Sequence, residues 1–272
     1  KRALRCDKQM YNGAKMILDD IIAKTKDRVA EQKKKMSLDY LERAMSSGYE
    51  PRDALEALRG SMNIIAEIKK SSPSRGLIRA DFHPLEIATE YEQNGASAIS
   101  VLTEPYYFSG DIEYLGLIRR FNSTILLRKD FLIDPYQIAR SRLYGADIVL
   151  LIARVLGKEK LKEMLDYARS IKLFALVEVH SEAELEMALY AGAQIIGINH
   201  RNLDTLAMDM SLSTRLVPEI PQDKVIVAES GLKTHEQLKE LSALGVNAFL
   251  IGEHFMKQTS PGAALKEIKY GK

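Results

Sequence analysis

Cysteine is almost absent from this chain of 272 residues, which carries only Cys6. A single thiol excludes an intrachain disulfide, and it excludes a zinc site built on several thiolates. Such low cysteine usage is typical of proteins that work in a reducing compartment, so we expect a cytoplasmic protein.

Long apolar runs and an excess of one charge are also missing. No segment approaches the roughly 20 apolar residues of a membrane helix, and the polar residues 1–12 lack the apolar core of a secretory signal. The 39 Lys and Arg nearly balance the 37 Asp and Glu, so no overall field attracts nucleic acid or an anionic membrane. The tyrosines are scattered and form no stacking platform. We expect neither a membrane nor a nucleic acid as partner.

What the chain does contain is a repeat. A glycine followed by Ala or Val precedes a short β-branched run four times, at 95–96, 145–146, 192–193 and 245–246. Glycine permits the left-handed cap that ends a helix, and the following run can then become a strand. Each interval has room for two strand-helix units.

Eight segments have the composition of strands, and helical patterns separate them. The strands are expected at 64–69, 98–102, 124–128, 147–151, 174–178, 195–199, 225–229 and 248–251; helices are expected within 84–91, 158–171, 181–191 and 234–244, with Ser181 and Thr234 as N-caps. Strict alternation of strand and helix favours a parallel sheet, and eight units favour an α/β fold of the (β/α)8-barrel (TIM-barrel) type. An open doubly wound sheet would place a Gly-rich loop after its first strand, where this chain has Lys-Lys-Ser-Ser-Pro-Ser.

The first strand is preceded by residues 16–62, which contain helical patterns at 18–33 and 51–58. We expect them to pack across the barrel or over its mouth, so that residues 16–272 form one catalytic domain. The chain starts with Lys, and Met16 opens an amphipathic segment. Residues 1–15 are therefore interpreted as an extension or a non-native leftover.

Polar residues gather at the predicted C-terminal ends of strands, where barrel enzymes carry their reacting groups. They are Glu67, Lys69, Lys129, Glu178, Asn199, Arg201 and Glu229. In a barrel they would surround one cavity, and opposite charges packed there would separate the pKa values of proton donors and acceptors. Two lysines on one rim also favour a lowered lysine pKa. The alternative is an ion-pair network with a structural role only.

Phosphate recognition has separate signals. Ser230 and Gly231 follow the seventh strand and Gly252 follows the eighth, where barrel loops commonly offer backbone N–H groups to a phosphate. Ser72, after the first strand, could add a hydroxyl. Together these residues predict a phosphorylated small-molecule substrate.

At these positions the chain resembles the indole-3-glycerol-phosphate synthase family, over nearly all of 16–268. The matching motifs, in order, are IIAEIKKSSPS (64–74), LTE (102–104) with YF (107–108), KDF (129–131), LVEV (176–179), GINHRNL (197–203) and VAESG (227–231). The resemblance implies a carboxy-lyase of tryptophan biosynthesis. It would convert 1-(2-carboxyphenylamino)-1-deoxyribulose 5-phosphate into indole-3-glycerol phosphate, carbon dioxide and water. No cofactor and no metal are expected, and the enzyme would act as a monomer, alone or beside other enzymes of its pathway.

The resemblance also assigns roles to residues. Lys129 would protonate the ketose carbonyl, Glu178 would assist the dehydration, and Lys69 would hold the substrate and share the acid role. The remaining roles are orientation by Glu67, Asn199 and Glu229, attraction of the anthranilate carboxylate by Arg201, phosphate binding by Ser72, Ser230, Gly231, Gly252 and the Glu253 amide, and apolar contact by Phe108, Phe131, Leu150 and Leu203.

Two positions depart from the family pattern. Glu253 stands where relatives have Ser or Thr, so only its backbone N–H could serve a phosphate, with the side chain turned outward. His200 replaces a small polar residue and is expected to line the mouth or cover the surface. A metal pair of His180 and His200 is disfavoured, because no helix carries a His-Glu-x-x-His arrangement.

Two other functions are compatible with such a barrel. One is a different phosphosugar enzyme, such as a phosphoribosylanthranilate isomerase, and the other is a non-catalytic binding or scaffolding barrel. The presence of Lys69, Lys129 and Glu178 together disfavours both, because the isomerase would use a different acid-base pair and a scaffold would be expected to lose one of these groups.

Overall fold

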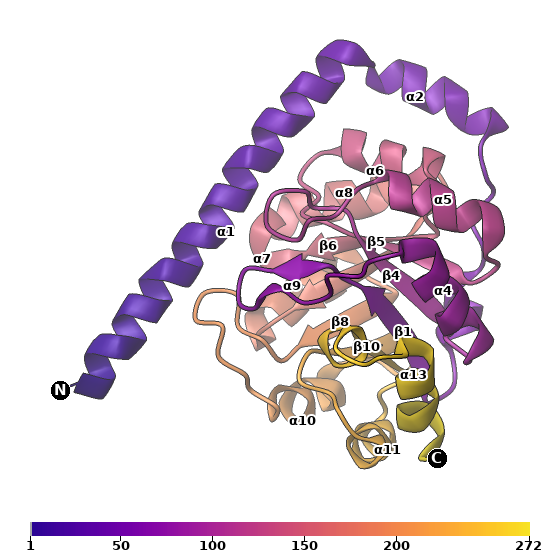
Figure 1. The fold of residues 1–272 in the computed structure, drawn as a ribbon. Helices are drawn as coiled ribbons and strands as arrows, with labels where there is room; N and C mark the ends of the chain where they lie inside the picture. The colour runs from indigo at the N-terminus through magenta and orange to yellow at the C-terminus, as the bar shows by residue number, and fades with distance from the viewer. Residues whose placement is uncertain (1) are drawn as a thin grey trace.

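A closed barrel of parallel strands forms the centre of the molecule (Figure 1). The computed structural model describes the backbone of residues 2–272 and the side chains of residues 17–45 and 47–272. Within that part of the chain the barrel strands, in sequence order, are β1 (Asn63–Ile68), β4 (Ala98–Leu102), β5 (Ile125–Lys129), β6 (Ile148–Ile152), β7 (Phe174–Val179), β8 (Ile195–Asn199), β9 (Val225–Glu229) and β10 (Ala248–Ile251). Strand β1 closes the barrel by pairing with both β4 and β10. The predicted (β/α)8 barrel is confirmed.

The predicted strand limits are right to within one residue. Strands β5 and β6 each begin one residue later than predicted, because Thr124 and Asp147, the residues just before them, take part in hydrogen bonds that involve side chains. The amide of Thr124 donates to Asn122, and the carboxylate of Asp147 accepts from the amide of Leu126.

Helices cover the outside of the barrel and bury its outer face. They are α4 (Pro84–Gln93), α5 (Glu113–Phe121), α6 (Pro135–Leu143), α7 (Ala153–Leu156), α8 (Lys158–Ser170), α9 (Glu182–Ala191), α10 (Leu212–Leu216), η2 (Val217–Glu219), α11 (His235–Leu244), α12 (Glu253–Met256) and α13 (Pro261–Tyr270). Ser181 and Thr234 cap α9 and α11 as predicted, and Gly192 and Gly245 end these helices in the left-handed conformation. Among the described residues, none of the helices has the length and apolar character needed to span a membrane.

Two apolar cores hold the barrel together. The outer core lies between the strands and the helices, and the inner core fills the barrel with side chains such as Ile65, Leu127, Leu176 and Val227. Alternate residues of each strand therefore face the two cores, as the period of two requires. Apolar side chains fill most of this interior, although Ser100 in the middle of β4 is also fully buried.

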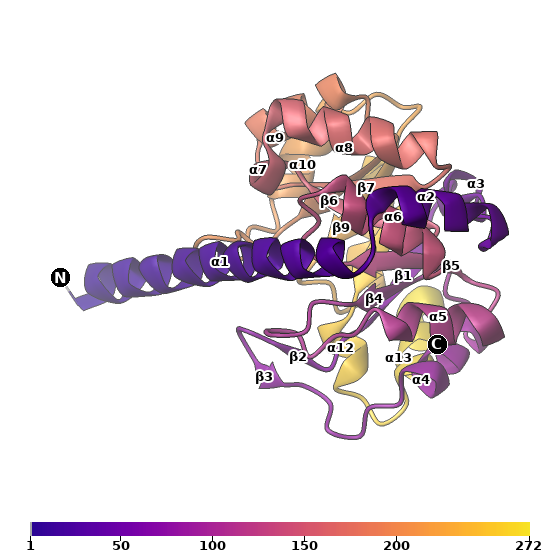
Figure 2. The same ribbon diagram turned by 90° about the horizontal axis from the view of Figure 1, so that it is seen from above.

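The N-terminal segment reaches both ends of the barrel. It contains α1 (Arg2–Lys35), α2 (Leu38–Ala44), η1 (Met45–Ser47) and α3 (Ala54–Leu58). Helix α1 runs along one side of the barrel and projects beyond it (Figures 1 and 2), while Leu58 of α3 packs into the inner core. Helix α1 extends without a break across residue 15, and Lys1 lies outside the described residues.

A short hairpin follows β1 at the C-terminal end of the barrel. Its strands β2 (Ser71–Ser72) and β3 (Gly76–Leu77) are antiparallel. The composition of 72–79, rich in turn formers and beside the predicted site, favours a mobile lid, and in the structure Ser72 pairs with Gly76 and Ser71 with Leu77. The hairpin lies beside α12 in Figure 2.

Candidate active site

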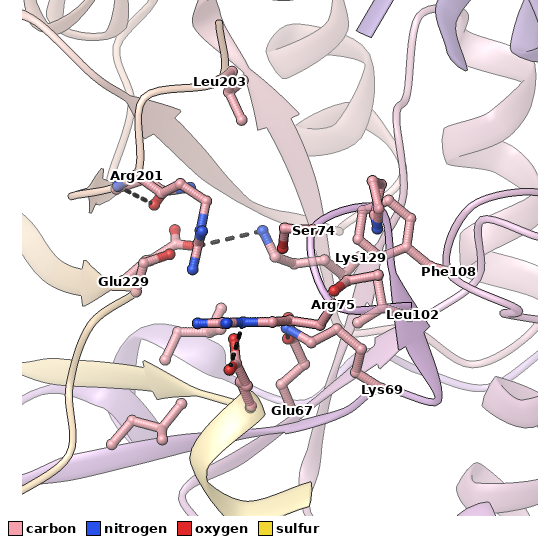
Figure 3. Close-up of a pocket in the computed structure, with 18 of the residues that line it drawn as sticks. Glu67, Lys69, Ser74, Arg75, Leu102, Phe108, Lys129, Arg201, Leu203 and Glu229 are labelled. Atoms are coloured by element: carbon pink, nitrogen blue, oxygen red, sulfur yellow. Dashed lines mark hydrogen bonds and ion pairs between the residues drawn. The ribbon is translucent and has the colours of Figure 1, made fainter. Parts of the chain in front are cut away.

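A cavity of about 530 Å³ opens at the C-terminal end of the barrel (Figure 3). Every site residue predicted from the sequence lines it, although the residues come from all eight barrel strands or the loops after them. They are Glu67, Lys69, Ser72, Phe108, Lys129, Phe131, Leu150, Glu178, Asn199, Arg201, Leu203, Glu229, Ser230, Gly231, Gly252 and Glu253.

Lys129 lies between two carboxylates in this cavity. Its Nζ is 3.0 Å from Oε2 of Glu178 and 3.3 Å from Oε2 of Glu229. Burial would lower the pKa of Lys129, but the charges of Glu178, Glu229 and Glu67 outweigh burial and raise it. The predicted lowering of a lysine pKa is therefore wrong for Lys129, because two carboxylates pair with its ammonium group. For Glu178, burial is in turn outweighed by the Lys129 charge, and its pKa is lowered.

Glu229 is the less satisfied of the two carboxylates. Its side chain is almost fully buried and its Oε1 has no hydrogen-bond partner. Burial raises the pKa of Glu229 to about 7, and the Lys129 charge only partly opposes this shift. The Oε1 atom packs against Gly197 so closely that a Cβ at that position would collide with it. Glycine on β8 thus makes room for the carboxylate.

Lys69, the residue directly after β1, forms an ion pair with Glu67 of that strand. Its Nζ is 2.6 Å from Oε1 of Glu67, as their shared face predicts. Lys70 points the other way, and its ammonium group lies 5.9 Å from the ring centroid of Phe82. Gly252 leaves space for Glu67 in the way that Gly197 does for Glu229.

The apolar part of the cavity lies beside these charges. The rings of Phe108 and Phe131 are tilted with centroids 6.3 Å apart, and Leu150 and Leu203 complete the wall. Arg201 enters the cavity after β8, where its backbone N–H donates to Oδ1 of Asn199 at 3.0 Å. A flat aromatic ring with a carboxylate at its edge fits this combination of surfaces.

A second polar region lies at the loops after β9 and β10. Ser230 and Gly231 both adopt positive φ, 68° and 79°, a conformation that is costly for serine. Backbone N–H groups in a turn can point into a shared concavity and bind an anion there. The predicted phosphate residues Ser72 and Gly252 line the same cavity.

Glu253 does not carry a free charge toward this region. Its Oε1 lies 3.0 Å from Nε of Arg75 and 2.6 Å from Nζ of Lys257. Burial would raise the pKa of Glu253, but Lys257 and Arg75 outweigh burial and lower it. The carboxylate is thus neutralised by two cations at the cavity edge, and Figure 3 shows Arg75 lying across the cavity.

The two histidines near the strand ends are both buried. His200 neither lines the cavity nor covers the surface, so that expectation is wrong. Its Nδ1 lies 3.0 Å from the carbonyl oxygen of Ser230 and its Nε2 lies 2.7 Å from Oγ of Ser213. The ring therefore fixes the loop that carries Ser230. Among the described residues, no three His, Cys, Asp or Glu side chains are grouped so as to hold a metal ion.

The sequence patterns did not identify several residues of the site. Ile17, Leu18 and Ile21 of α1 line the cavity, and Arg28 of the same helix donates to Asp130, the residue after Lys129, at 3.0 Å. No local signal connects residues about 100 positions apart. Arg75 and Lys257 at the cavity edge were also missed, and only Arg75 had a signal, as a cation within the turn-rich segment 72–79.

Comparison with known proteins gives a consistent result. Residues 18–268 match the family model described as indole-3-glycerol phosphate synthase. The indole-3-glycerol phosphate synthase of Campylobacter fetus subsp. fetus is 54% identical over 256 residues, covering 93% of this chain and 99% of the relative. That of Aliarcobacter butzleri is 52% identical over 259 residues, covering 93% and 98%.

Solved structures agree with the fold. KGPDC from Streptococcus mutans aligns with a TM-score of 0.59 at 15% identity, covering 76% of this chain and 95% of that one. The 3-hexulose-6-phosphate synthase from Salmonella typhimurium aligns with a TM-score of 0.58 at 11% identity, covering 76% and 96%. Structural similarity at such low sequence identity supports the barrel fold alone.

Proposed function

The chain belongs to the indole-3-glycerol phosphate synthase family, and we propose that the charged residues at the mouth of its barrel carry out the reaction of that family. The enzyme is a carboxy-lyase of tryptophan biosynthesis. It closes the indole ring of 1-(2-carboxyphenylamino)-1-deoxyribulose 5-phosphate with loss of carbon dioxide and water. The observation that carries the residue assignment is the Lys129 ammonium group, held between two buried carboxylates next to an apolar wall.

Ring closure needs an acid at the ketose carbonyl. The aromatic carbon that bears the carboxylate attacks the carbonyl carbon, and the carbonyl oxygen becomes an alkoxide unless it is protonated. Lys129 donates that proton, and Lys69, directly after β1, stabilises the developing negative charge. A lysine with a raised pKa can still serve, because an alkoxide is a stronger base than an amine.

Decarboxylation and dehydration complete the reaction. Release of carbon dioxide returns an electron pair to the ring, and the apolar wall of Phe108, Phe131 and Leu150 favours loss of the charged carboxylate. Dehydration then removes the hydroxyl group made in the first step. Glu178 assists by exchanging a proton with the departing hydroxyl, while Glu67, Asn199 and Glu229 orient the substrate and the two lysines.

The substrate is oriented by its two anionic ends. The phosphate binds to backbone N–H groups of Gly231, Gly252 and Glu253 and to the hydroxyl groups of Ser72 and Ser230. The anthranilate carboxylate binds Arg201, with the ring against Leu203 and the two phenylalanines. Two separated anion sites fix the ketose carbonyl between them, near Lys129.

Assembly and location follow as further parts of the proposal. All barrel strands and the cavity come from one chain, so a monomer is sufficient for the reaction, and association with other tryptophan-pathway enzymes is not required. Residues 16–272 are the catalytic domain and residues 1–15 are an extension. The single cysteine supports work in the reducing cytoplasm.

Two variants test the division of roles between Lys129 and Glu178. In a single turnover, Lys129→Met should block both carbon dioxide release and indole formation. Glu178→Gln should release carbon dioxide faster than it forms indole, because only the later dehydration needs the carboxyl group. Equal slowing of both products in Glu178→Gln would contradict the assignment of Glu178 to dehydration.

A further inference from the structure

His180 lies behind Glu178, outside the cavity lining. Its side chain is only 3% exposed. The ring fits between two carboxylates, with Nε2 3.1 Å from Oε1 of Glu178 and Nδ1 3.0 Å from Oε2 of Glu184. Glu178 therefore has a lysine on one side, at its Oε2, and a histidine on the other, at its Oε1.

The position of His180 is fixed from α9. Its backbone N–H donates to Oε2 of Glu184 at 2.9 Å, and the backbone N–H of Glu184 donates to Oγ of Ser181, the N-cap of that helix. Glu184 is itself mostly buried. The ring thus cannot move away from Glu178 without breaking contacts at the start of α9.

The ring is charged in this environment. Burial would lower the pKa of His180, but Glu178 and Glu184 outweigh burial and raise it to about 9. The Nε2 atom has no aligned hydrogen bond, since Oε1 of Glu178 lies off the N–H direction, so its contact with Glu178 is that of two charges. The charged groups paired with the ring are Glu178 near the end of β7 and Glu184 on α9. Lys129 of β5 lies beyond Glu178, and Glu229 of β9 lies beyond Lys129.

We propose that His180 is a positioning residue that keeps Glu178 a carboxylate while Lys129 delivers its proton to the substrate. This inference rests on the proposed function. Glu178 is 3.0 Å from the Lys129 ammonium group, so it competes with the ketose oxygen for the same proton. Transfer to Glu178 would leave a neutral lysine and a neutral carboxyl group, and the ring would not close.

The imidazolium of His180 opposes that unproductive transfer. A positive charge that remains beside Glu178 makes its carboxylate a weaker base, so the proton moves to the alkoxide instead. The need is greatest when Lys129 has become neutral, because His180 is then the cation that remains paired with Glu178 among the described contacts. A purely structural histidine would need only its hydrogen bonds to α9.

The pH dependence of turnover distinguishes the two roles. We would measure kcat and KM from pH 5.5 to 9.5 for the wild type, His180→Gln and Glu184→Gln. His235→Gln is the matched control, because the ring of His235 is likewise fixed through Nδ1, which donates to the carbonyl oxygen of Ile268 at 2.8 Å, and lies outside the cavity lining. In His180→Gln we expect kcat to fall about 10-fold or more at pH 7 with little change in KM. The acidic limb of kcat should move up by about one pH unit.

Glu184→Gln should shift the acidic limb in the same direction by less, and His235→Gln should match the wild type. A lower kcat in His180→Gln with an unshifted acidic limb would assign His180 a structural role and overturn the proposal. Failure of the wild type itself to form indole would instead contradict the proposed function.

A measurement on the wild type covers the case in which His180→Gln does not fold. The imidazole signals of His180, followed by NMR, should remain those of the charged ring until about pH 9. Titration of this ring below pH 7 would also overturn the proposal, since the charge would then be missing when the enzyme works.

Discussion

The ammonium nitrogen of Lys129 lies 3.0 Å from a carboxylate oxygen of Glu178, and both side chains are largely buried. A lysine held in this way stays charged in the resting enzyme, and productive transfer of its proton requires a substrate oxygen that takes the place of a carboxylate as its partner. The site is therefore arranged so that the arriving substrate oxygen becomes the acceptor.

Replacement of Lys129 should abolish most turnover. We expect Lys129→Ala to lower kcat by about 10³-fold or more, because an acid and a positive charge are lost together. The control is Lys70→Ala. Lys70 follows Lys69 in the sequence but does not line the cavity, and its ammonium group lies over the ring of Phe82. Steady-state kinetics and a melting curve of each variant are the measurements. A loss of less than about tenfold in a folded Lys129→Ala would remove this residue from the mechanism.

Arg201 should act on binding rather than on the chemical step. Arg201→Ala removes the proposed partner of the anthranilate carboxylate, so we expect KM to rise about tenfold or more while kcat changes little. Arg201→Lys should be intermediate, because a lysine keeps the charge and loses the paired donors. If KM stayed unchanged in Arg201→Ala, the carboxylate would have to bind elsewhere.

The Arg75 and Glu253 pair should control phosphate affinity. Arg75→Ala frees the Glu253 carboxylate from one of its two cations, so repulsion of the substrate phosphate should raise KM by about tenfold. Adding Glu253→Gln to Arg75→Ala should restore much of the affinity. If the double variant had the same raised KM as Arg75→Ala, Arg75 would act on the phosphate without Glu253. The inhibition constant of inorganic phosphate, measured for each variant, gives the same comparison directly.

Glu229 should make stability depend on pH. Its pKa is raised from 4.5 to about 7 in the folded protein. The protonated side chain therefore contributes fully to the free energy of unfolding below pH 4.5, and this contribution is lost as the pH rises through about 7. Glu229→Gln cannot ionise, and its free energy of unfolding relative to the wild type should increase by about 1–3 kcal/mol between pH 4.5 and 8.5. Urea unfolding at both pH values measures this difference.

The control for that experiment is Glu240→Gln, on the exposed face of α11. Its effect on stability should be small at both pH values. A difference between Glu229→Gln and the wild type that did not depend on pH would show that Glu229 is ionised in the folded protein at both ends of the range.

Much of the fold could be predicted because each strand carries its own signal. The glycines before β4, β6, β8 and β10 and the caps Ser181 and Thr234 act within a few residues. Once eight strands are placed, the barrel itself brings their ends together. Glu67, Lys129, Glu178 and Glu229 could thus be assigned to one cavity without knowledge of any side-chain contact.

The rest depends on which neighbours meet across the barrel. Two lysines on one rim suggested a lowered pKa, but the pairing of Lys129 with Glu178 and Glu229 reverses the direction. His200 looked like a residue of the mouth, and only the packing of α10 shows that Ser213 bonds to its ring. Likewise, the contact of Arg28 with Asp130 joins segments about 100 residues apart.

The most direct test is to incubate the purified wild-type protein with 1-(2-carboxyphenylamino)-1-deoxyribulose 5-phosphate, without added metal or cofactor, and to follow indole fluorescence. Lys129→Ala serves as the control. Indole signal from the wild type, with none or a trace from a folded Lys129→Ala, is the predicted result. Absence of signal from a folded wild type, or equal signals from both proteins, would contradict the account of ring closure by Lys129 at the mouth of the barrel.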